Sequence, residues 1–139
     1  MAWAKIDNPK PNYSVASVPP MSVKVKAREA PKRGNRYIQI AVGYALCDKA
    51  RLLQKEHRVH ILVGSGADAG KVAITLDDAT GKFKAKRRAD GRYEVVVSNL
   101  AAAGKFSTTF PPFMQPGSVQ MIPGGPPVVV FDAPADFLA

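Results

Sequence analysis

Basic side chains are the residues of this sequence best suited to chemistry, because they gather in two short stretches. The 139-residue chain carries 20 Lys and Arg against 11 Asp and Glu, a formal net charge of +9. The first stretch spans residues 24–36 and the second spans residues 82–92, whereas no basic residue follows Lys105. Such a distribution is typical of proteins that contact phosphate groups or an acidic surface.

Both stretches contain the alternation of a strand with one basic face. In residues 82–88, KFKAKRR, lysines alternate with Phe83 and Ala85, and in residues 21–28 they alternate with Val23 and Val25. Side chains on one face of a strand repeat every 6.6–7 Å or so, about twice the phosphate repeat of one DNA strand. We expect the aromatic Phe83 to face the core, which leaves no aromatic on the basic side and favours contact to the phosphate backbone over base stacking.

We therefore predict a nucleic-acid-binding surface, with DNA favoured over RNA. The residues expected to contact phosphate are Lys82, Lys84, Lys86, Arg87 and Arg88, with Lys24, Lys26 and Arg28 in support. The alternative is that these lysines only protect an exposed edge strand from pairing with other chains.

No other set of residues forms a recognisable reactive site, so we expect no enzyme activity, cofactor or metal. Residues 64–71, GSGADAGK, lack the spacing of a phosphate-binding loop, and a β-branched strand follows instead of a helix. His57 and His60 do not have a metal-ligand spacing and are expected to be solvated. The single cysteine, Cys47, is expected to fill space in a helix.

The segment from residue 37 to 76 has the clearest pattern of secondary structure. It predicts a strand over 38–42, a helix over 44–54, a strand over 59–63, a glycine-rich turn over 64–70 and a strand ending at 76. Leu46, Ala50 and Leu53 share one face of the predicted helix.

Further strands are predicted over 21–28, 82–88, 92–98, 119–122 and 128–131. Residues 99–105 suggest a weak helix, residues 106–117 a loop, and Phe137 and Leu138 of the tail can pack on the body. The fold class that follows is mainly β, a small closed barrel or sandwich of short antiparallel strands with one short helix.

We divide the chain into a proline-rich arm (1–20), a single β-rich domain (21–133) and a tail (134–139). The same order of elements recurs in residues 37–76 and 92–131, which suggests a pseudo-two-fold duplication.

A second function is compatible with the arm. Trp3 and Tyr13 lie on it and could anchor it to a neighbouring subunit, as in a virion-type structural assembly protein. Under either function we expect a homo-oligomer with no membrane contact and no small-molecule substrate. The start of the sequence has no secretory apolar region and no apolar run reaches about 18 residues, so we expect a cytoplasmic protein, or a virion protein under the alternative.

Residues 37–76 resemble the swapped-hairpin barrel of AbrB-type transition-state regulators and MazE-type antitoxins. Leu53 matches the leucine that ends the family's helix, Arg58 and Val59 begin the next strand, and residues 72–76 match the last strand, although Glu56-His57 replaces the usual Gly-Asp. The resemblance implies DNA binding near the first strand and helix, here by Arg36, Lys49 and Arg51. The hairpin from Val63 to Lys71 is also similar to that of small uncharacterised phage proteins of alphaproteobacteria, which implies a phage or prophage setting.

Overall fold

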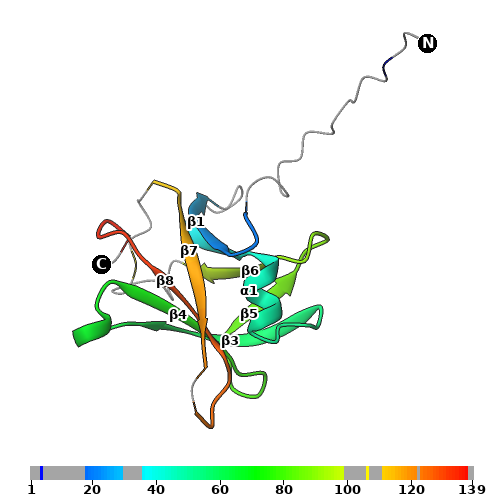
Figure 1. Cartoon of the computed structure of the whole chain (residues 1–139). Coiled ribbons are helices and arrows are strands. Elements are labelled where there is room, and N and C mark those ends of the chain that lie inside the picture. Colours follow the sequence, from blue (N-terminus) through cyan, green and yellow to red (C-terminus); the bar gives the residue numbers. More distant parts are fainter. Residues whose placement is uncertain are drawn as a thin grey trace.

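The residues that the structure describes fold into one closed antiparallel β-barrel with a single short helix (Figure 1). A computed structural model describes Ala4, residues 18–29 and 36–98, Phe106, and residues 111–121 and 123–137. Within these residues, no helix is long and apolar enough to cross a membrane.

The barrel is built from eight strands. In chain order they are β1 (Ser22–Glu29), β2 (Arg36–Val42), β3 (Glu56–Val63), β4 (Lys71–Leu76), β5 (Phe83–Arg87), β6 (Tyr93–Ser98), β7 (Phe113–Gln120) and β8 (Val128–Asp132). The helix α1 (Tyr44–Lys49) follows β2, and the 3-10 turn η2 (Gly66–Asp68) lies within the hairpin between β3 and β4. These elements confirm the predicted fold class.

Closure gives every strand two neighbours. The order around the barrel is β1-β2-β6-β5-β3-β4-β8-β7, and β7 pairs with β1 to complete it. Closed barrels leave no strand edge with unpaired amide and carbonyl groups.

The interior is filled by alternate residues of each strand. Val23 and Val25 of β1 are fully buried, and so are Ile38 and Ile40 of β2. Phe137, from the C-terminal segment, is also fully buried and stacks on Phe106 with ring centroids 4.6 Å apart. This confirms the predicted packing of Phe137 on the body, whereas Leu138 lies outside the described residues. In each strand, the residues between these inward-facing positions necessarily point outward.

The strand order has an internal two-fold symmetry. Strand β1 lies between β2 and β7, and β5 lies between β6 and β3, so exchanging β1–β4 with β5–β8 leaves the order unchanged. The axis passes between β2 and β6 on one side of the barrel and between β4 and β8 on the other. That residues 37–76 and 92–131 arose by duplication stays a prediction. The strand order has the two-fold symmetry expected of two such units, and each unit then begins one strand earlier, with β1 or β5.

The helix is shorter than predicted. It ends at Lys49 instead of residue 54, because Arg51 takes a left-handed conformation (φ 63°) and the amide of Leu52 bonds to the carbonyl of Cys47 at 2.9 Å. Leu52 is therefore buried, whereas Leu53 is 64% exposed and does not share the buried face.

The predicted loop at 106–117 is wrong in its last part, because β7 begins at Phe113. Pro116 and Gly117 lie inside this strand, opposite β1 and β8. Proline lacks an amide to donate, but the amide of Gly117 donates to the carbonyl of Met21 at 2.9 Å and keeps β7 attached to the start of β1.

Gly43 joins β2 to α1 at a point where two chain segments almost touch. A side chain there would place its first carbon 2.3 Å from the carbonyl oxygen of Pro19 and 2.4 Å from that of Pro20. The Pro20 carbonyl accepts hydrogen bonds from the amides of Ala45 and Leu46. Glycine is required here for close approach of backbone to backbone.

We expect Gly43→Ala to destabilise the fold by more than about 3 kcal/mol, because the clash is with rigid backbone and overpacking commonly costs 1–3 kcal/mol. Urea unfolding measures the change. Gly124→Ala is the matched control, since Gly124 has φ 74° but nothing within 4 Å, and only the conformational cost of about 1 kcal/mol is expected. Equal losses for the two variants would contradict the role given to Gly43.

Candidate nucleic-acid interface

The two basic stretches of the sequence come together on one outer surface of the barrel. This surface, here called the cationic face, is formed by β1, β2, β6, β5 and β3, which are consecutive neighbours in the barrel. It carries Lys24, Lys26, Arg28, Arg58, Lys82, Lys84, Lys86, Arg88 and Arg92. It is hollowed in two places, and both hollows are lined by Arg88, Glu94 and Val96.

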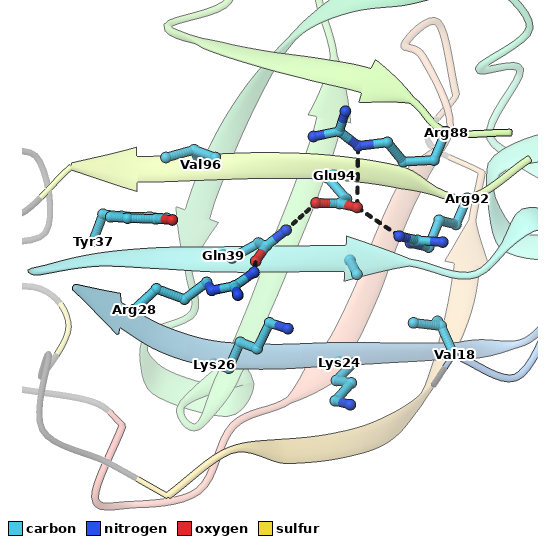
Figure 2. A pocket seen from close by; sticks show the side chains of 11 residues that line it. Val18, Lys24, Lys26, Arg28, Tyr37, Gln39, Arg88, Arg92, Glu94 and Val96 are labelled. Carbon is cyan, nitrogen blue, oxygen red and sulfur yellow. Dashed lines mark hydrogen bonds and ion pairs between the residues drawn. The ribbon is translucent and has the colours of Figure 1, made fainter. Parts of the chain in front are cut away.

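The first hollow has a volume of about 450 Å³ and lies over β1, β2 and β6. Figure 2 shows Lys24, Lys26 and Arg28 following one another along β1, with Arg92 and Arg88 on the far side of β2. Val18 closes one part of the rim. Because Val23 and Val25 fill the core, the lysines between them must project from the outside of the barrel.

Glu94 is the acidic centre of this hollow, and its side chain is only 6% exposed. Its Oε1 lies 2.8 Å from Nη2 of Arg92 and 3.1 Å from Nε of Arg88 (Figure 2). Its other oxygen accepts a hydrogen bond from Gln39, whose own oxygen accepts one from Arg28 at 2.9 Å. Through these contacts, one buried carboxylate fixes side chains from β1, from β2 and from the turn before β6.

The pKa of Glu94 reflects these partners. Burial alone would raise it, but the charges of Arg88 and Arg92 and their hydrogen bonds outweigh burial and hold the pKa below its usual value. Arg92 is further fixed by Asp90, at 2.6 Å. Arg88 and Arg92 are thus largely neutralised, and they serve to shape the face more than to add charge to it.

The lysines of β1 are in the opposite situation. Burial, followed by the charges of Arg28 and Lys24, lowers the pKa of Lys26. None of these three cations forms an ion pair with a carboxylate that the structure describes. An anion placed in the hollow would relieve their mutual repulsion.

Tyr37 corrects one expectation from the sequence. It lines the first hollow beside Arg28, its partner in the ladder between β1 and β2, so the basic side does include one aromatic ring (Figure 2). Phe83 behaves as predicted and packs against the core, although its edge also reaches the second hollow.

The second hollow, of about 540 Å³, lies over β6, β5 and β3. It is lined by Lys82, Lys84 and Lys86, all exposed, and by Arg58 of β3. Ala85, between two of these lysines, is buried in the core. Strand β5 therefore has the predicted division into one apolar and one basic face.

Other predicted contact residues are not brought to this face. Arg87 is exposed, but it alternates with Lys86 and does not line either hollow. Lys49 ends α1, and Arg51 follows it. Arg36 begins β2, but its side chain, like Trp3 and Tyr13 of the arm and the suggested helix at 99–105, lies outside the part of the chain that the structure describes.

Sequence reasoning missed Gln39, Arg58, Arg92 and Glu94 as parts of the face. The alternation of Gln39 with Ile38 and Ile40 is a signal for an outward position, but it does not say which neighbour the side chain meets. The likeness of Lys-Val-Lys-Ala-Arg at 24–28 to Lys-Phe-Lys-Ala-Lys at 82–86 indicates two strands of the same kind, but it does not show that they share a surface.

His57 is buried rather than solvated, which corrects the prediction. Its Nε2 accepts hydrogen bonds from the amides of Leu53 and Gln54, and its Nδ1 lies 3.1 Å from Asp78. This geometry requires the proton on Nδ1. His57 thus secures the segment after α1 and the turn after β4. The described residues contain no group of three or more His, Cys, Asp or Glu that could hold a metal ion.

Cys47 is fully buried, and its thiol contacts the carbonyl of Val42 at 3.4 Å. Burial raises its pKa to about 12. The thiol is therefore neutral and inaccessible, as expected for a side chain that fills space.

Comparison of the chain with protein-family models, with curated proteins and with solved structures gave no match. The likeness of residues 37–76 to AbrB-type regulators therefore stays a prediction. The functional interpretation depends on the geometry of the cationic face.

We expect Glu94→Gln to destabilise the barrel by about 1–3 kcal/mol at pH 7, because Arg88 and Arg92 lose their shared carboxylate. The depressed pKa of Glu94 means that its ion pairs contribute above the unfolded-state value, about 4.3, and are lost as the pH falls through the lower folded-state value. The difference between wild type and variant should therefore narrow on acidification.

Urea unfolding at pH 7 and at pH 3 measures both effects. Glu56→Gln is the matched control, because Glu56 is exposed on β3 and forms no ion pair with a described residue. A Glu94→Gln variant that equals wild type at pH 7, or a difference that grows towards pH 3, would contradict this account.

Proposed function

We propose that this chain is a non-enzymatic nucleic-acid-binding protein that contacts the phosphate backbone through the cationic face. The observation that carries the proposal is that two basic segments, more than fifty residues apart in sequence, meet on one hollowed surface. Lysines and arginines spaced along neighbouring strands are suited to a polymer of regularly spaced negative charges.

Barrel closure argues against the alternative interpretation, in which these lysines only protect an exposed edge strand. A guard against edge pairing is useful only on a strand with a free edge. Strand β1 is paired with β2 and β7, and β5 is paired with β3 and β6. The concentration of charge on one side of a closed barrel therefore favours a binding role.

The composition of the face also favours phosphate over bases. Six of its cations, three beside β1 and three beside β5, have no described carboxylate as an ion-pair partner: Lys24, Lys26, Arg28, Lys82, Lys84 and Lys86. Among the residues that the structure describes, Tyr37 is the one aromatic residue that lines the first hollow. Stacking platforms for single strands use successive aromatic rings.

A filter-binding titration at several salt concentrations tests the proposal. If six phosphates are contacted, affinity for nucleic acid should fall about 10³-fold between 50 and 200 mM salt, because each contact releases counterions. Poly-glutamate of similar length and charge is the control for an acidic protein partner. Absence of binding at 50 mM salt, binding indifferent to salt, or equal affinity for poly-glutamate would overturn the proposal.

A further inference from the structure

We propose that the nucleic acid is a duplex, whose two strands are contacted by two equivalent rows of cations on either side of the internal two-fold axis. This inference rests on the proposed function and names its ligand. The β1 row consists of Lys24, Lys26 and Arg28, and the β5 row consists of Lys82, Lys84 and Lys86.

The rows are equivalent by topology. Exchange of β1–β4 with β5–β8 preserves the strand order and converts β1 into β5. In both rows the residues between the cations face the core: Val25 and Ala85 are buried, and Ala27 and Phe83 pack against the core cluster. The two rows therefore present the same pattern, basic, apolar, basic, Ala, basic, from the same side of the barrel wall.

The rows also run in opposite directions. Each step from β1 to β2, β6 and β5 is an antiparallel pairing, so β1 and β5 are antiparallel. Three spacings of about 4.8 Å separate them by roughly 14 Å along the sheet. Duplex DNA likewise presents two antiparallel rows of phosphates, one on each side of a groove.

The space between the rows is nearly neutral. The ladder between β2 and β6 places Gln39 opposite Val96 and Ala41 opposite Glu94. Glu94 and Asp90 together balance the charges of Arg88 and Arg92, with which they form ion pairs. Phosphates are therefore attracted to the β1 row and the β5 row, on either side of this nearly neutral space. A duplex can place one strand against each row, whereas a single strand could occupy only one row at a time.

Affinity for a 20-base-pair DNA duplex and for each of its separated strands, measured by fluorescence anisotropy at 50–300 mM salt, tests this inference. The variants are Lys24→Gln with Lys26→Gln, Lys82→Gln with Lys84→Gln, and all four together. Each pair occupies equivalent positions of one row. Lys55→Gln with Lys71→Gln removes the same charge away from both hollows and is the matched control.

We expect the duplex to bind more tightly than either strand. Each row variant should lose about 30-fold in duplex affinity at 0.15 M salt, with a salt slope shallower by about 1.8, the effect of two lost phosphate contacts. The quadruple variant should show the product of the two losses, and the control should bind like wild type. Thermal melting followed by circular dichroism verifies that all variants are folded.

Two results would contradict the inference that the ligand is a duplex, while leaving the proposed function in place. One is a single strand that binds as tightly as the duplex. The other is a strong loss from one row variant with none from the other. If wild type binds neither nucleic acid, the proposed function itself fails.

Discussion

Closure of the barrel by the pairing of β7 with β1 is the constraint on which the rest of the structure depends. Once every strand has two neighbours, each side chain must point either into the core or away from it. Apolar residues take the inner positions, so the charges of eight strands can only lie outside. The strand order then determines where on the outer surface the charged side chains gather.

The order places β2 and β6 between the two basic strands. Their separation by two strands leaves room for the buried network of Glu94, which fixes Arg88, Arg92 and Gln39 between them. Charge balance in the middle and free charge at the flanks are therefore both results of topology.

Much of this architecture follows from local sequence patterns. Local sequence patterns identified seven of the strands and the last part of β7, and turn residues identified the hairpin around 64–70. The division of β5 into a basic and an apolar face was also evident from the order of its residues. These features depend on neighbours within one strand or one turn.

The features that the sequence did not reveal depend on distant partners. The helix ends early because Arg51 adopts a conformation usually taken by glycine, and no glycine marks the position. Strand β7 contains Pro116 and Gly117, which suggest a loop until β1 and β8 supply its hydrogen bonds. The burial of His57 and Glu94 similarly required knowledge of which strands become neighbours.

The buried thiol of Cys47 can report on local opening of the structure around it. A neutral sulfur enclosed between α1 and the barrel cannot react with an alkylating reagent until that enclosure opens. Because the chain has one cysteine, every modified molecule records the same event at the same place. The rate of alkylation under native conditions therefore reports how often that enclosure opens, and no engineered label is needed.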